Sequence, residues 1–271
     1  MSNEHGNTVL RNDNVTSPAT LGHNLITIAS GKGGVGKTWV AVTLCHAMAR
    51  AGKRVLLFDG DLGLANVDIQ LGLMPQRDLG NVIAEGLDLR SAMTPFVDSS
   101  KVGFDIIAGK SGSGALAALA RTQVKALRTE LLMLSGAYDQ VVLDLGAGLE
   151  NAVTAMTANS GTTLVVITDE PTSLTDAYAY IKVQTMRNPG SDIRVLVNVA
   201  DSRRGGEQTY ETLRRACEGF LKISPPLAGI VRRDSKVRES IRRQTPTLAL
   251  YPQSNAGRDI EALAQNLGPL P

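Results

Sequence analysis

The sequence contains no apolar run that approaches the roughly 20 residues needed to cross a bilayer as a helix. Its N-terminus also lacks the basic and then apolar pattern of a secretory signal, so we expect a cytoplasmic protein. Cysteine is scarce, because Cys45 and Cys217 are the only two and no paired spacing joins them. This scarcity predicts reduced structural thiols and argues against an iron–sulfur cluster, which requires several ligating cysteines.

The net charge is small but unevenly distributed. The 271 residues carry a formal charge of +2, and 43% hydrophobic and 20% charged residues are values typical of a globular protein. Residues 203–243 hold eleven Lys or Arg against five Asp or Glu. This basic segment could contact nonspecific DNA or an anionic membrane, although a scattered, solvated basic surface is equally consistent. The candidate contacts are Arg203, Arg204, Arg214, Arg215, Arg232, Arg233, Arg242 and Arg243.

Two parts of the chain differ in pattern. Residues 1–22 are polar and without periodicity, which predicts a flexible N-terminal arm, and residues 23–271 predict one domain. Short apolar runs that alternate with helical segments predict an α/β fold with a doubly wound, mostly parallel sheet and helices on both faces. The expected strands are 25–29, 54–58, 104–108, 141–144, 163–168, 193–197 and 227–231. The expected helices are 40–50, a helical excursion within 78–98, 115–134, one that opens at Pro171, and 259–267.

The stretch GKGGVGKT, residues 31–38, lies between a predicted strand and a predicted helix. Its glycines allow the backbone to wrap a triphosphate with inward N–H groups, and the helix N-terminus adds partial positive charge. Lys37 is expected to reach the β- and γ-phosphates and Thr38 to ligate Mg²⁺. A Gly- and Lys-rich turn that merely links strand to helix accounts poorly for the complete pattern in this context. The predicted nucleotide-binding residues here are Gly33, Gly34, Val35, Gly36, Lys37, Thr38 and Trp39.

Three carboxylates follow or end predicted strands. Asp59 and Asp61 close the run at 54–58, and Asp144 closes the run at 141–144. Because the carboxyl ends of parallel strands face the ligand crevice, Asp61 is suited to position a hydrolytic water. Asp144 is expected to reach Mg²⁺ through water, and Asp59 to bind the water shell of Mg²⁺ or to hold the loop. The alternative is that Asp59 and Asp61 only cap the next turn.

Several stretches carry a family resemblance. The extra lysine of GKGGVGKT, Lys32, is similar to that of the deviant Walker A motif of the MinD/ParA ATPases. The runs DGDLGLANVDIQLGL (59–73) and EPTSLTDAYAYIK (170–182) resemble those of the flagellar-number group of that family, known as FlhG or FleN. The similarity covers about residues 24–267.

The resemblance implies a mechanism and a role. It implies an ATPase that uses ATP and Mg²⁺, dimerises with ATP and hydrolyses it slowly as a switch. By the same resemblance Lys32 reaches the phosphates of the partner subunit, Asp61 organises the attacking water, and Asn198 contacts adenine. The catalytic set is then Lys32, Lys37 and Asp61. The implied role is control of flagellar number or placement, with a basal-body component, a partner GTPase or a transcription regulator as protein partner, and a peripheral position at a cell pole or membrane as an alternative.

The sequence departs from the family pattern at some positions. Trp39 stands where many relatives have a small polar residue at the α-phosphate, and Arg232 stands where proline is common. Tryptophan can stack or pack there but cannot supply an oxygen ligand. The sequence ends without a basic amphipathic helix of the kind that anchors some members to membrane. A metabolic amidoligase or dethiobiotin-type synthase of the same fold is disfavoured, since no substrate-pocket residues are recognisable beyond the nucleotide motifs.

Overall fold

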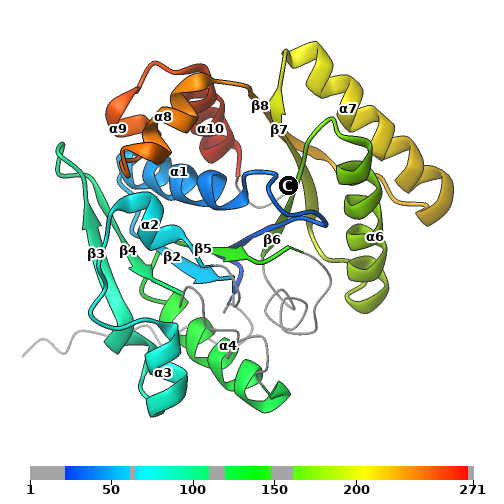
Figure 1. Ribbon diagram of the computed structural model, residues 1–271. Helices are drawn as coiled ribbons and strands as arrows, with labels where there is room; N and C mark the ends of the chain where they lie inside the picture. The colour runs from blue at the N-terminus through cyan, green and yellow to red at the C-terminus, as the bar shows by residue number, and fades with distance from the viewer. Residues whose placement is uncertain (1–21, 62–64, 110–119, 148–160, 268–271) are drawn as a thin grey trace, which may run out of the picture.

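A computed structural model describes residues 22–61, 65–109, 120–147 and 161–267. Eight strands form one sheet in the order β3-β4-β2-β5-β1-β6-β7-β8 (Figure 1). Seven of them are parallel, and β3 pairs antiparallel with β4 at one edge. The strands are β1 (Leu25–Ala29), β2 (Val55–Gly60), β3 (Met93–Val97), β4 (Gly103–Ile107), β5 (Gln140–Leu145), β6 (Thr162–Ile167), β7 (Ile193–Ala200) and β8 (Leu227–Arg232).

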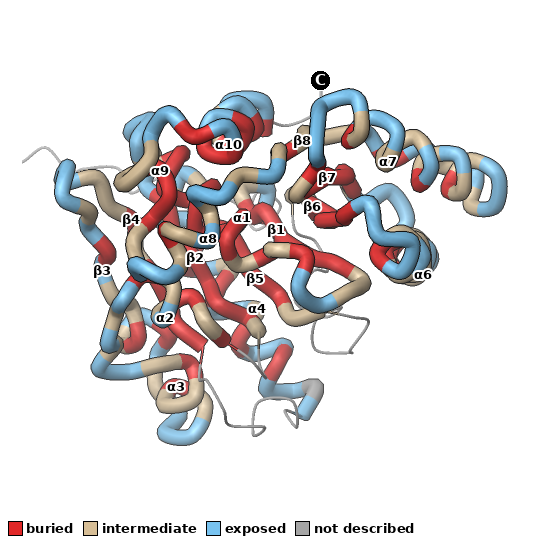
Figure 2. Tube along the Cα trace, turned by 45° about the horizontal axis from the view of Figure 1, so that its top comes forward, coloured by how far each residue is buried: buried red, intermediate tan, exposed pale blue. Residues whose placement is uncertain are grey.

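Helices cover both faces of the sheet, and the strands separate distinct apolar clusters. Ile26 and Ile28 pack under the helices α1, α2, α9 and α10, whereas their neighbour Leu25 faces α3 and α4 on the other side. On that same second face, Val165 packs against α6 and α7. Figure 2 shows the buried strands enclosed by helices whose outer sides are exposed. The helices are α1 (Lys37–Arg50), α2 (Val67–Leu71), α3 (Leu79–Glu85), α4 (Arg121–Ser135), α6 (Pro171–Arg187), α7 (Arg203–Ala216), α8 (Ser235–Arg242), α9 (Thr247–Leu250) and α10 (Asn255–Asn266).

The central strands bring the expected site residues to one edge of the sheet. β1 lies between β5 and β6, and every residue of β1 and β2 is buried. A strand that is buried on both faces reads as a continuous apolar run, which is why these strands stand out in the sequence. In the β2–β5 pairing Asp59 lies directly opposite Asp144. The carboxyl ends of β1, β2 and β5 therefore meet beside the N-terminus of α1.

The predicted α/β fold with a mostly parallel sheet is confirmed, with three corrections to its elements, of which one is that the helix expected at 259–267 begins at Asn255. The prediction of a helical excursion within 78–98 was wrong for its last part, because residues 93–97 form the edge strand β3 after α3 and a short 3₁₀ turn at Leu89–Ala92. The helix expected from residue 40 begins at Lys37. Residues 115–119 of the helix expected at 115–134 and the N-terminal arm, apart from Gly22, lie outside the described residues. In the described part of the chain, no helix is long and apolar enough to span a bilayer.

Candidate functional site

The loop between β1 and α1 has the backbone geometry of an anion cradle. Gly34 and Gly36 adopt φ of 78° and 92°, a region that favours glycine. A Cβ added to Gly36 would lie 2.5 Å from the Asn198 side-chain nitrogen, so the close approach also requires glycine. Asn198 Nδ2 donates to the Val35 carbonyl over 2.8 Å, which ties the loop to β7. The first N–H groups of α1 are thereby held open for an anion.

Lys37 and Thr38 lie beside two of the predicted carboxylates. Lys37 is only 8% exposed, and burial lowers its pKa although Asp144 and Asp61 oppose that shift. The Thr38 side chain hydrogen-bonds to Asp144. Asp144 is 1% exposed, and burial raises the pKa of its carboxyl group. The structure thus brings Lys37, Thr38, Asp61 and Asp144 together at the start of α1.

The residues at this point fit a magnesium ion that is shared with phosphate oxygens. Asp144 Oδ1 is buried and has no hydrogen-bond partner, so an oxygen lone pair is available next to the Thr38 hydroxyl. Among the described residues, no group of three His, Cys, Asp or Glu side chains could hold a metal ion alone. Mg²⁺ is commonly held by one or two protein oxygens together with substrate phosphates and water. Thr38 and Asp144 supply the protein part of that set.

Asp59 is occupied by the backbone of the loop that follows it. Its Oδ1 accepts from the Asp61 N–H at 3.2 Å, and its Oδ2 accepts from the N–H groups of Asn66 and Val67 at 3.1 Å. Burial and the neighbouring charge of Asp144 raise the pKa of Asp59. Of the two roles considered for the Asp59 side chain, these contacts correspond to holding the loop, because they fix the backbone at Asp61 and at Asn66 and Val67.

Lys32 is held within its own chain. Its ammonium group forms an ion pair with Glu170 and donates to Thr172 Oγ1 at 2.8 Å, at the start of α6. The preceding Gly31 packs so closely on α6 that an added Cβ would lie 2.2 Å from the Asp176 backbone. Residues 170–182 stand out in the sequence only by their resemblance to the flagellar-number group. The contact between Lys32 and Glu170 could not be predicted from a local pattern, because 138 positions separate the two residues.

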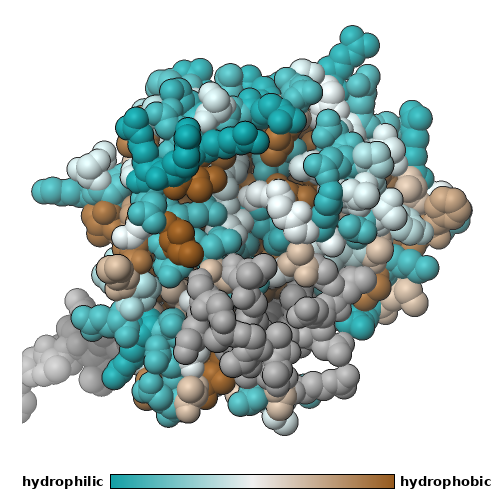
Figure 3. Space-filling model, viewed as in Figure 1, coloured by the Kyte–Doolittle hydropathy of each residue, from teal (hydrophilic) through white to brown (hydrophobic). Residues whose placement is uncertain are grey.

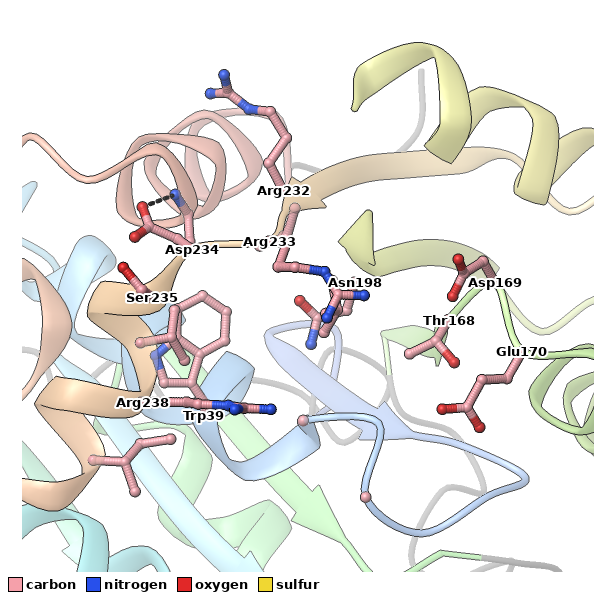
Figure 4. A pocket seen from close by; sticks show the side chains of 17 residues that line it. Trp39, Thr168, Asp169, Glu170, Asn198, Arg232, Arg233, Asp234, Ser235 and Arg238 are labelled. Carbon is pink, nitrogen blue, oxygen red and sulfur yellow. Dashed lines mark hydrogen bonds between the residues drawn. The ribbon is translucent and has the colours of Figure 1, made fainter. Parts of the chain in front are cut away.

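A cavity of about 530 Å³ continues from the loop between the ends of β6, β7 and β8 and helix α8. Trp39, Asn198 and Arg238 are among its lining residues (Figure 4). Val199, also in the lining, has φ of 59°, which is strained for a β-branched residue and is a frequent mark of functional sites. Arg232 points away from the cavity and bonds to Asp259 of α10. Arg232, which stands where proline is common in the family, therefore links the end of β8 to α10.

Most of the candidate arginines of the basic segment form ion pairs with nearby acids. Figure 3 shows hydrophilic side chains over the region of α8–α10. Of the eight arginines proposed as contacts, six form ion pairs, which leaves Arg204 and Arg242 without a recorded acid partner in the described ranges. The pairs of Arg214, Arg215, Arg233 and Arg243 lie at the surface and are worth at most about 1 kcal/mol each, so these arginines can exchange their acids for other anions, whereas Arg203 and Arg232 bind the buried Asp259. The six are Arg203, Arg214, Arg215, Arg232, Arg233 and Arg243.

Comparison with known proteins identifies the family. The model of the CobQ/CobB/MinD/ParA nucleotide binding domain matches residues 26–248. The chain belongs to this family. It is 36% identical to the antiactivator FleN of Pseudomonas aeruginosa, over 91% of this chain and 88% of FleN. It is 24% identical to the flagellum site-determining protein YlxH of Helicobacter pylori, over 93% of this chain and 85% of YlxH.

A solved structure has the same fold. MinD from Pyrococcus horikoshii, determined in complex with Mg-ADP, matches 90% of this chain and 95% of its own with a TM-score of 0.73 and 23% identity. At this identity the likeness supports the fold alone. Together with the family match, the prediction of a MinD/ParA-class ATPase that uses ATP and Mg²⁺ is confirmed at the level of the family.

In the ligand-free protein, the buried carboxyl groups of Asp59 and Asp144 are expected to contribute less to stability as pH rises. Because the pKa values of Asp59 and Asp144 are raised in the folded protein, the folded state keeps protons that the unfolded state releases above a pH of about 4. The two carboxyl groups therefore contribute their full stabilisation to the free energy of unfolding below their pKa in the unfolded chain. This contribution is lost as pH rises through their pKa values in the folded protein. We expect a decrease of at least the ~1.4 kcal/mol of unfolding free energy that one pKa unit represents.

Urea unfolding of the ligand-free protein between about pH 5 and about pH 8 measures this effect. Asp144→Asn removes one of the two buried charges and the repulsion on Asp59, so its stability should depend less on pH across this range. Equal pH dependence of the wild type and Asp144→Asn would show that these carboxyl groups are not the cause.

Proposed function

We propose that the protein is an ATP-driven switch that regulates flagellar number or placement. The observation that carries the proposal is the 36% identity to FleN over 91% of the chain, and YlxH is a second relative with a flagellar name. The P-loop, the carboxylates at the ends of β2 and β5, and the adjoining cavity supply the parts that a nucleotide switch requires. Its direct partner would be a flagellar basal-body component, a partner GTPase or a transcription regulator.

The geometry supports defined roles for the residues around the P-loop. The N–H groups at the start of α1 and Lys37 bind the phosphates. Thr38 and Asp144 hold Mg²⁺, which neutralises phosphate charge when it is bound. Asp61 lies close to the β5 end, since a Cβ on Gly146 would be 3.3 Å from its Oδ1. From that position Asp61 orients the attacking water, while Asp59 keeps the intervening loop in place.

The switch step that we propose is ATP-dependent dimerisation. Two subunits would close with their nucleotides between them, and Lys32 would leave Glu170 and Thr172 to meet the phosphates of the neighbouring subunit. The Lys32 side chain is 32% exposed and that of Glu170 is 59% exposed, so the ion pair can be exchanged without unfolding the core. An exposed pair of this kind is weak, whereas a triphosphate offers several charged acceptors. ADP would leave Lys32 on Glu170 and the subunits apart.

Lys32→Ala tests this step. We expect the variant to bind ATP within about threefold of the wild type but to remain monomeric, because Lys37 and the loop backbone are intact. Light scattering after gel filtration with ATP and Mg²⁺ measures the mass. Lys125→Ala, which removes an exposed lysine on α4, is the matched control and should dimerise normally. A Lys32→Ala protein that dimerises as fully as this control would contradict the proposed role of Lys32.

The alternative proposal is a positioning ATPase whose ATP dimer binds nonspecific DNA or an anionic membrane surface through residues 203–243. Arg204 and Arg242 are exposed and carry no recorded acid partner in the described part of the chain, so they favour this contact more than the six paired arginines do. Binding of this kind would weaken steeply with salt. The similarity to FleN favours the protein-partner function as the first proposal.

A further inference from the structure

Arg238 differs from the other arginines that line the cavity. Arg232 binds Asp259 through Nε at 2.8 Å and a terminal nitrogen at 2.9 Å, and Arg233 binds Asp201 at 2.9 Å. Arg238 has no recorded hydrogen-bond or ion-pair partner among the residues that the structure describes. Its guanidinium extends from α8 past the Trp39 ring into the cavity, in the direction of the P-loop (Figure 4). An unpaired cation thus lies in a cavity that opens onto an anion cradle.

Two of the acids near Arg238 bind other groups, and a third lies across the cavity. Asp234 accepts from the Lys236 N–H at 2.9 Å and from the Ala256 N–H at 3.4 Å, so its carboxylate caps α8 and reaches α10. Glu170 is paired with Lys32. Asp169 lies across the cavity from Arg238 in Figure 4. Arg238 is exposed and lines the cavity, so an anion that enters the cavity can meet its guanidinium without displacing one of these acids.

Trp39 lines the same cavity, and its one polar group is already bonded. It is the third residue of α1, next to Thr38, yet its indole N–H donates to Thr247 Oγ1 at 2.8 Å. The Thr247 hydroxyl in turn lies 2.6 Å from Ser240 Oγ, and both hydroxyls are in buried residues. The indole therefore offers no donor to a ligand. The same chain of hydrogen bonds ties the first turn of α1 to α8, two residues beyond Arg238.

We propose that Arg238 is a nucleotide-binding residue, whose guanidinium contacts the phosphate chain of the bound nucleotide from α8 where Trp39 supplies no polar group. The Trp39–Thr247–Ser240 hydrogen bonds position it. This inference rests on the nucleotide site proposed above and adds a residue from outside its motifs. Guanidinium groups suit the task, because their planar set of N–H donors matches phosphate oxygens and remains charged at every relevant pH.

Calorimetric titration of four proteins with ATP, ADP and adenosine tests the proposal. Arg238→Ala should bind ATP and ADP at least about tenfold more weakly than the wild type and leave adenosine binding unchanged. Arg238→Lys should recover part of the loss. Arg242→Ala is the matched control, because Arg242 is an exposed arginine on the same helix, has no recorded acid partner, and lies outside the cavity lining. It should bind within twofold of the wild type.

Each other outcome is decisive. Wild-type affinity of Arg238→Ala for ATP overturns the inference, as does an equal loss in Arg242→Ala, which would indicate a general charge effect. A loss as large for adenosine as for ATP overturns the assignment to the phosphates. Failure of the wild type itself to bind ATP would contradict the nucleotide site as a whole, so that failure is distinguishable from a failure of Arg238 alone.

A double-mutant cycle tests the positioning step. Trp39→Phe keeps an aromatic wall but removes the indole N–H, so α8 loses its hydrogen-bonded link to α1. We expect ATP affinity to fall less than in Arg238→Ala, and Trp39→Phe combined with Arg238→Ala to be no weaker than Arg238→Ala alone. Strictly additive losses would overturn this step. Thermal unfolding followed by circular dichroism shows whether each variant is folded.

Discussion

Lys37→Ala is expected to abolish nucleotide binding, with an affinity for ATP at least about 100-fold below that of the wild type. Lys37 is 8% exposed, and its ammonium group lies beside Asp144 and Asp61 at the start of α1. Charge-assisted hydrogen bonds contribute about 1.5–3 kcal/mol each, and several phosphate oxygens would lose one. Removal also leaves two carboxylates facing the phosphates without compensation, which adds repulsion.

The chain carries a convenient reporter for this measurement. Trp39 is the single tryptophan and lines the cavity, so its fluorescence responds to ligand in the adjoining site. Lys125→Ala serves as the control for loss of a lysine elsewhere. If Lys37→Ala, shown to be folded, titrated with ATP like the wild type, the P-loop would not be the nucleotide site.

Asp61→Ala is expected to retain ATP and to lose its hydrolysis. A residue that positions or activates water typically contributes about 10²–10⁴-fold to the rate, so turnover should fall by at least ~100-fold. ATP affinity should change little or improve, because a negative charge near the phosphates is removed. A single-turnover assay with excess protein separates the chemical step from binding.

Asp68→Asn is the control for Asp61→Ala. The Asp68 carboxylate belongs to α2, which follows the loop that Asp59 holds. It should hydrolyse ATP within a few-fold of the wild type. Equal single-turnover rates for Asp61→Ala and the wild type would exclude Asp61 from the chemistry and point to another group at the β2 or β5 end.

The sheet was largely predictable from the sequence, for a physical reason visible in β1 and β2. Strands that are buried on both faces appear as unbroken apolar runs, and the runs at 25–29 and 54–58 match the observed strands within two residues. β3 lacks this signal. Its residues 93–97 include an exposed Val97 and a proline, and only Phe96 is buried, because an edge strand is partly open to solvent.

The residues of the site were predictable from the sequence to different degrees as well. The P-loop and the carboxylates at strand ends belong to short contiguous motifs, so their residue types and spacing can be recognised in the sequence. The ion pair of Lys32 with Glu170 and the hydrogen bond of Trp39 to Thr247 join residues 138 and 208 positions apart. No local pattern encodes such pairs. They exist because the parallel topology returns β6, β7 and β8 to the same edge as β1.

The mass of the Asp61→Ala protein with saturating ATP and Mg²⁺, compared with its mass in ADP and Mg²⁺, shows whether ATP drives dimerisation. Blocked hydrolysis removes the step that would dissociate an ATP dimer, so equilibrium sedimentation can measure the dimer without turnover. We expect twice the monomer mass of 28.7 kDa in ATP and the monomer mass in ADP. The same mass in both nucleotides would contradict an ATP-driven switch.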